Sequence, residues 1–127
     1  MRLLEISAEK QCTRALYDLG IIYEYGKFSI EKDFAKAFKY YEKGDALDDA
    51  ACMTILGVLL VDSDEIAHDD SRAFQLFSKA ASKGDAMAYD NLGNCYKLGI
   101  GTEANLDKAT ECYAKAAELK EKRNNIE

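Results

Sequence analysis

One short pattern, a small residue followed four positions later by Leu-Gly, occurs three times in this chain of 127 residues. The glycines of the three copies are Gly20, Gly57 and Gly93, which are 37 and 36 residues apart. Self-similarity at a fixed period of roughly 20–50 residues is the signature of stacked repeat architectures. This spacing constrains the fold strongly, because each copy has to form the same supersecondary unit.

A second pattern follows each Leu-Gly pair at a constant distance. It consists of an acidic or amide residue, then a basic residue and an alanine three and four positions later; its first residues are Asp33, Asp69 and Asn105. Asp and Asn side chains accept hydrogen bonds from the free backbone N–H groups at the start of a helix. Each unit is therefore predicted to contain helix A, a loop, helix B and a short turn.

The predicted helices cover most of the chain, with spans of 12–25, 34–44, 48–61, 70–83, 86–98 and 106–122. Helix pairs this short are marginal alone, so the units must stack on one another. The glycine inside each helix A costs helix stability, about 1 kcal/mol, which indicates that it lets helix B approach closely. Because the chain also has no proline, we predict an all-α fold, an α/α superhelical solenoid of three helix–loop–helix repeats plus a partial N-terminal helix.

We expect one repeat domain spanning 1–127. Its predicted parts are a partial preceding helix B at 1–11, repeats at 12–47, 48–84 and 85–122, and a tail at 123–127. The N-terminus lacks the apolar core of a signal peptide, and no apolar run reaches the length of a membrane span. If the chain is complete, a cytoplasmic location is the default expectation.

In the third repeat, Leu92-Gly93 is followed by Tyr96, Gly99 and Gly101, and later by Tyr113-x-Lys115-Ala116-Ala117. This spacing resembles the SEL-one-like repeat (SLR), a relative of the tetratricopeptide repeat. The first repeat keeps most of these positions but carries one inserted residue before Ile30. The second departs most, because the tyrosine and both loop glycines are replaced, by Leu60, Ser63 and Glu65.

The resemblance covers about residues 4–120. It implies a right-handed superhelix in which helix A lines the concave face. It also implies a scaffold or adaptor that binds proteins and is not an enzyme. Fold alone leaves the partner open.

The side chains beside the Leu-Gly positions of each helix A are expected to face the concave groove. Helix 48–61 is unusual because it carries no charge from Ala50 to Val61. One interpretation is that neighbours bury this middle helix on all sides. The other is that Ile55 and Val58 form an apolar strip for a partner's helix or peptide. The residues expected to contact a partner are Tyr17, Ile21, Thr54, Ile55, Val58, Asn91 and Asn94.

Asn91 and Asn94 are three residues apart, which places both on one helix face. Amide side chains offer a donor and an acceptor, so such a pair can hold a peptide backbone through paired hydrogen bonds. The alternative is that both are ordinary solvated polar side chains.

No residue spacing typical of a catalytic, cofactor or metal site is found, so we predict none. The single histidine, His68, lies in an acidic loop without the turn glycine and closing Glu of an EF-hand. The four cysteines form no Cys-x-x-Cys pair and are expected to be reduced. Cys95 and Cys112, on the two helices of one repeat, are the one pair whose positions would suit a bridge.

The net charge of −6 disfavours nucleic acids and anionic membranes as partners. We therefore expect a protein or peptide partner on the concave face, with no small-molecule substrate. The alternative is a structural or self-associating segment of a longer repeat array with no independent ligand.

Overall fold

A computed structural model describes residues 13–64 and 67–124 of the chain, and this part is built entirely from helices and their connections. The helices are α2 (Thr13–Tyr25), α3 (Phe34–Ala46), α4 (Ala50–Asp62), α5 (Asp70–Ser82), α6 (Ala86–Leu98) and α7 (Leu106–Asn124). Every bound lies within two residues of its prediction. The predicted all-α solenoid is confirmed, and the predicted helix at 1–11 lies outside the described residues.

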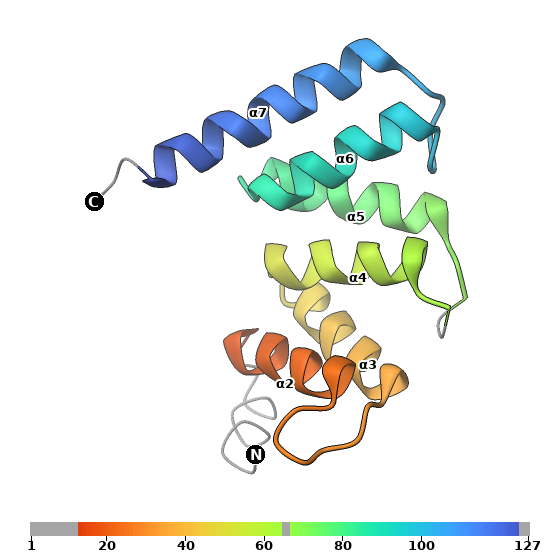
Figure 1. Ribbon diagram of the computed structural model, residues 1–127, viewed down its shortest axis with the longest axis vertical. Coiled ribbons are helices and arrows are strands. Elements are labelled where there is room, and N and C mark those ends of the chain that lie inside the picture. The colour runs from red at the N-terminus through yellow and green to blue at the C-terminus, as the bar shows by residue number, and fades with distance from the viewer. Residues whose placement is uncertain (1–12, 65–66, 125–127) are drawn as a thin grey trace.

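The helices are stacked in chain order along the long axis of the molecule (Figure 1). Helices α2, α4 and α6 are the A helices, and α3, α5 and α7 are the B helices that follow them. Each A helix packs on its own B helix, and each B helix except the last packs on the next A helix. Such a row of neighbour contacts is how a repeat protein buries its core.

The three predicted N-caps of the B helices are confirmed. Asp33, Asp69 and Asn105 each accept a hydrogen bond from the backbone N–H three residues later, at 3.1 Å in all three cases. This bond satisfies one of the donors that the first turn of a helix leaves free. The sequence therefore fixes where each B helix begins.

The glycine of each Leu-Gly pair lies under an aromatic ring from the B helix of its own repeat. Gly20 packs against Tyr41, and a Cβ atom added to Gly57 or Gly93 would lie 2.6 Å from a ring carbon of Phe77 or Tyr113. Real Cβ atoms do not approach other atoms so closely. The predicted close approach of helix B is thus confirmed, and the ring that requires it is identified.

The boundaries between repeats are packed by small side chains. At the first boundary Gly44 of α3 lies against Cys52 of α4, and a Cβ on this glycine would meet that of Cys52 at 2.5 Å. At the second boundary the equivalent residues are Ala80 and Ala88, which are both fully buried. The first boundary thus has a glycine where the second has Ala80, and the larger Cys52 where the second has Ala88. The larger side chain fills the space that the missing methyl group leaves, as close packing requires.

The A helices form the inner row of the stack. The backbone of helix α4 lies close to those of both α2 and α6, whereas no two B helices approach one another so closely in the described part of the chain, and α3 and α5 meet through the long side chain of Arg72. Helices that are closer together on one side of a stack curve it toward that side. The A helices therefore line the concave side, and α4 lies at its centre.

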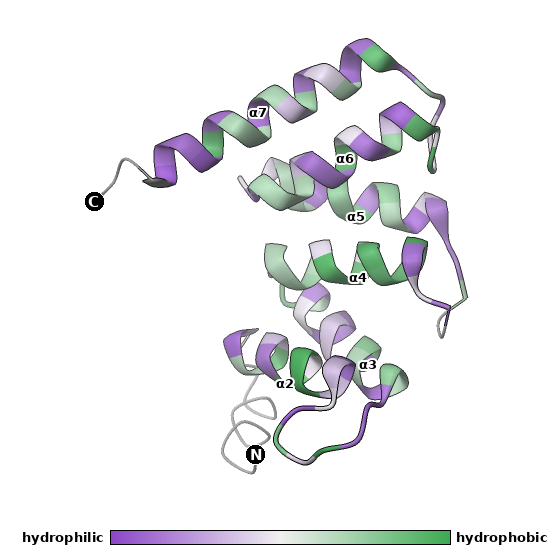
Figure 2. Ribbon diagram, in the orientation of Figure 1, coloured by the Kyte–Doolittle hydropathy of each residue, from purple (hydrophilic) through white to green (hydrophobic). Residues whose placement is uncertain are grey.

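Helix α4 is the most apolar helix of the stack, as Figure 2 shows. Its side chains at Met53, Leu56 and Leu59 are buried among the neighbouring helices. No helix among the described residues is long and apolar enough to cross a membrane. The apolar character of α4 thus follows largely from its central place in the row.

Candidate functional site

One face of α4 remains accessible on the concave side. The residues on it are Ala51, Ile55, Val58 and Asp62, which are three or four positions apart and therefore lie along one face of the helix. Ile55 and Val58 are half-buried, whereas Met53 and Leu56 are fully buried. Each interpretation of α4 thus describes part of the helix: most of it is core, and a narrow apolar strip is left open.

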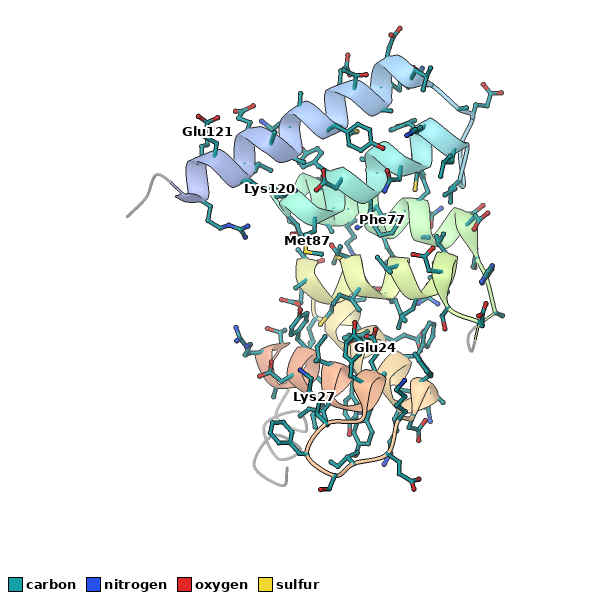
Figure 3. All side chains as sticks on the ribbon, viewed as in Figure 1. Glu24, Lys27, Phe77, Met87, Lys120 and Glu121 are labelled. Atoms are coloured by element: carbon teal, nitrogen blue, oxygen red, sulfur yellow. The ribbon has the colours of Figure 1, made fainter. Side chains whose placement is uncertain are left out.

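A pocket of about 120 Å³ lies beside this strip, between α4 and α6. Its hydrophobic walls come from both helices and from the loop after α6. The ring of Phe77, labelled in Figure 3, lies in the layer between α4 and α6. The lining residues are Val58, Val61, Asp62, Phe77, Asn91, Asn94, Cys95, Leu98 and Ile100.

The aromatic ring of the second repeat differs from its equivalents in having no hydroxyl group. The Tyr41 hydroxyl donates to Glu24 at 2.8 Å, and the Tyr113 hydroxyl donates to Asn94. Phe77 occupies the same position in α5 and presents only carbon atoms to the pocket. Sequence reasoning missed Phe77 as a site residue, although the Tyr-Phe-Tyr order of the three repeats could have revealed it.

Asn91 and Asn94 both line the pocket, and each uses one end of its amide within the protein. Asn91 donates through Nδ2 to the carbonyl of Met87 at 3.0 Å. The Oδ1 atom of Asn94 accepts a hydrogen bond from the Tyr113 hydroxyl group. The amide oxygen of Asn91 and the amide nitrogen of Asn94 form no hydrogen bond among the described residues, so the pair offers at least one acceptor atom and one donor atom to a ligand.

Thr54 faces inward and lies outside this surface. Its side chain is only 2% exposed, and its hydroxyl lies within hydrogen-bonding distance of the Ala50 carbonyl, at 3.0 Å, and of the Asp85 carboxylate. A hydroxyl has one hydrogen to donate, and the charged carboxylate is the stronger acceptor. Thr54 therefore connects α4 to the start of α6, and its side chain lies in the core and not on the concave surface where contact with a partner was expected.

Tyr17 and Ile21 of α2 lie in a separate, more open pocket. This pocket has a volume of about 400 Å³ and is also lined by Asp18, Ile22, Lys27 and Phe28. Tyr17 also lines a hollow between the starts of α2 and α4, together with Thr13, Arg14, Asp49 and Ala51. The structure thus brings Val58, Asn91 and Asn94 together and places Tyr17 and Ile21 at the neighbouring repeat, with Ile55 in the central helix.

The cysteines of the described residues are structural. Cys52, Cys95 and Cys112 are free and buried, as the expectation of reduced small residues requires. Burial raises the pKa of Cys95 to about 11 and also raises the pKa of Cys112, so both thiols are protonated at neutral pH. No bridge joins Cys95 and Cys112, and Cys12 lies outside the described residues.

No group of three or more His, Cys, Asp or Glu side chains that could hold a metal ion occurs within residues 13–64 and 67–124. His68 is exposed, and its Nε2 atom lies 2.9 Å from the Ser63 carbonyl oxygen, to which it donates. This contact links His68 to Ser63, the residue that follows α4.

Three stretches of the chain, residues 13–44, 50–85 and 86–121, match the Sel1 repeat. The chain is 39% identical over 64 residues, half of its length, to the rat (Rattus norvegicus) DAP3-binding cell death enhancer 1, and this match spans 12% of the relative. It is 30% identical over 112 residues, 87% of its length, to cytochrome c oxidase assembly factor 7 of Xenopus tropicalis, of which it covers 48%. The chain thus spans less than half the length of these relatives.

The fold is also similar to solved structures. The crystal structure of c5321, a protective antigen of uropathogenic Escherichia coli with an SLR fold, superposes with a TM-score of 0.85 and 29% identity. The match covers 91% of this chain and 24% of that one. Because the three matched repeats together cover most of the sequence, the chain belongs to the Sel1 repeat family.

Proposed function

We propose that this chain is a non-catalytic protein-interaction module that binds a peptide or helix on its concave face. The observation that carries the proposal is the pocket between α4 and α6, where an apolar floor lies beside two asparagines. Peptide-binding grooves commonly combine pockets for side chains with hydrogen bonds to the peptide backbone. The relatives support a role in protein–protein interaction, since one is named for binding DAP3 and another for assembling cytochrome c oxidase.

The two asparagines suit a peptide in an extended conformation. In such a peptide, the N–H and C=O groups of the residue at the pocket point away from the strand axis and can be bonded in pairs. The free acceptor of Asn91 would take the N–H group, and the free donor of Asn94 would reach the carbonyl. Bonding to the backbone in this way would fix the register of the peptide whatever its sequence.

The decisive experiment is a selection of random peptides displayed on phage against the purified chain and against a Val58→Asp variant. Val58 is half-buried and lines the pocket, so an aspartate there places a charge in the apolar floor. Because Val58 also packs against the core, the comparison is made with variant protein whose circular dichroism spectrum matches that of the wild type. We expect the wild-type chain to enrich related peptides and the variant to lose them.

A Gln75→Asp variant is the matched control, because it adds the same charge on the outer side of the stack, where Gln75 lies beside Asp45 and Arg72. It should enrich the same peptides as the wild type. If Val58→Asp keeps the wild-type selection while its circular dichroism spectrum is unchanged, the concave pocket is not the binding site.

A second candidate role is self-association through the outer face of α7. Ala117 in α7 is exposed, whereas its equivalent in α5, Ala81, is buried at the boundary with the third repeat. The outer face of α7 thus has the shape of an unfilled repeat boundary. Light scattering coupled to gel filtration tests this role, which requires a dimer in the wild type and a monomer in an Ala117→Glu variant.

A further inference from the structure

The charge around the α4–α6 pocket narrows the class of peptide that it accepts. Asp62 is the single charged side chain among the residues that line this pocket. It lies four positions after Val58, on the same face of α4, and is exposed. A ligand whose apolar side chain enters the pocket therefore meets a carboxylate at the edge.

The Asp62 carboxylate is not compensated within the described residues. No ion pair to it is formed there, whereas the neighbouring concave carboxylates Asp18 and Asp90 pair with Arg14 and Lys120. The last turn of α4 contains no basic residue, in contrast to the last turns of α3, α5 and α6. Asp62 thus adds a negative charge to the end of a helix that is already the negative pole of its dipole.

The pocket itself suits one aliphatic side chain. Its volume is about 120 Å³, and an apolar cavity of roughly 150 Å³ is large enough for a benzene molecule. Leu98, which lines the pocket, is 67% exposed, so an incoming side chain would also cover this leucine. The apolar side chains that line part of the pocket, together with its acidic edge, favour an apolar group that carries a cation nearby.

We infer that the occupant of this pocket is a peptide in which an aliphatic residue lies next to, or a few positions from, a lysine or arginine. The aliphatic side chain fills the space between Val58, Phe77 and Leu98, and the cation pairs with Asp62 and the carbonyl end of α4. The net charge of −6 also attracts basic peptides, as the Asp62 carboxylate does. This inference rests on the proposed function, since it names the class of peptide that the concave face selects.

The test uses the same phage library, with the wild-type chain and two charge-reversal variants. Asp62→Lys reverses the charge at the pocket, and it is expected to fold, because lysine is favourable at the end of a helix. Asp64→Lys is the matched control, since Asp64 is exposed and close in sequence but does not line the pocket.

We expect wild type and Asp64→Lys to enrich peptides with an aliphatic residue and a nearby base, and Asp62→Lys to lose the preference for the base. With a synthetic peptide from the wild-type selection, Asp62→Asn should weaken binding about two- to fivefold at low salt, and less at high salt. Fluorescence polarisation at two salt concentrations measures this difference.

The outcomes separate the two proposals. Peptides enriched without any basic preference, or an unchanged charge preference in Asp62→Lys, would overturn the inference and leave peptide binding in place. Failure of the wild-type chain to enrich any peptide would overturn the proposed function, and the inference with it.

Discussion

At the scale of single residues, the glycines of the A helices show how one missing side chain determines the packing of a repeat. Each lies under a ring from the B helix, at Tyr41, Phe77 or Tyr113. A glycine in a helix normally costs about 1 kcal/mol relative to alanine. The cost is accepted here because the ring occupies the space in which a Cβ would lie.

The first prediction concerns Gly57→Ala. In an open helix this change would stabilise the protein, but here the new Cβ would lie 2.6 Å from a ring carbon of Phe77. Overpacking a core costs roughly 1–3 kcal/mol, so we expect a net loss in the free energy of unfolding. Urea denaturation followed by circular dichroism measures it.

The double variant Gly57→Ala, Phe77→Leu is the control, because a smaller side chain in α5 makes room for the added methyl group. It should be more stable than the sum of the two single changes predicts. Strict additivity, or a Gly57→Ala protein more stable than wild type, would contradict the packing explanation.

At the scale of the helices, the basic residue at the start of the B helix makes different contacts in different repeats. Lys36 lies over the ring of Tyr23 at 4.9 Å, and Lys108 lies over that of Tyr96 at 5.5 Å. The second repeat has a leucine in place of this tyrosine. These basic residues are at the start of each B helix, so the replacement changes the contacts available to the one in α5.

Arg72 in α5 contacts the first repeat. Its guanidinium group donates to Glu42 at 3.0 Å and lies 5.7 Å from the centre of the Phe38 ring, both in α3. Cation–π contacts and exposed ion pairs each contribute modestly, about 0.5 kcal/mol. In the repeat where Leu60 replaces the tyrosine, the basic residue at the start of the B helix therefore contacts the B helix of the preceding repeat.

Arg72 connects the second repeat to the first, and the contact between Thr54 and Asp85 connects the second repeat to the third. Asp49 caps α4 by accepting from the Cys52 N–H at 3.0 Å, but Asp85 makes no such side-chain bond at the start of α6. Its carboxylate accepts from the buried Thr54 hydroxyl. The cap residue of the third repeat thus serves to join two repeats.

The second prediction is that Thr54→Val destabilises the protein although valine has nearly the same shape. The change removes the donor and leaves the Asp85 carboxylate without it, which costs about 1–3 kcal/mol. A double-mutant cycle with Asp85→Ala, measured by urea denaturation, should give a coupling energy of about 1 kcal/mol or more.

Because Thr54 is buried, Thr54→Val should still enrich the peptides that the wild-type chain selects. Additive effects of Thr54→Val and Asp85→Ala would show that the bond does not couple the helices. Loss of peptide selection in a folded Thr54→Val protein would return Thr54 to the binding surface.

At the scale of the whole molecule, the described chain is a row in which α4 holds the central place. It contacts α2, α3, α5 and α6, so it belongs to the interfaces with both outer repeats. In a repeat protein, stability is approximately a sum of unit and nearest-neighbour terms. A destabilising substitution in the middle repeat should therefore lower the stability of more of the chain than the same substitution in an end repeat.

The third prediction compares Leu56→Ala in α4 with Leu92→Ala in α6. Both side chains are buried, and each truncation should cost roughly 2–5 kcal/mol. We expect Leu56→Ala to reduce the protection of backbone amides from α2 to α7, because it weakens both boundaries. Leu92→Ala should reduce protection mainly in α6 and α7.

Hydrogen exchange read by mass spectrometry on peptic fragments gives this comparison directly. An equal loss of protection along the chain in both variants would indicate a single cooperative core and would contradict the nearest-neighbour description.

Most of the fold could be predicted from local and periodic features of the sequence. The repeat period, the caps at Asp33, Asp69 and Asn105, and the glycine inside each A helix are local or periodic features, so they could be predicted without coordinates. The helix period also placed Val58, Asn91 and Asn94 on the groove side, and all three line one pocket.

How far each helix face is covered by its neighbours could not be predicted from the sequence, because it depends on how the repeats pack together. Helix period gives the direction of a side chain, but the neighbouring repeat decides whether it is open or buried, and the start of α6 covers Thr54. Phe77 and Asp62 belong to the pocket because α5 and the end of α4 meet α6 there. Such a site depends on how the units stack, and stacking depends on the fit of side chains far apart in the sequence.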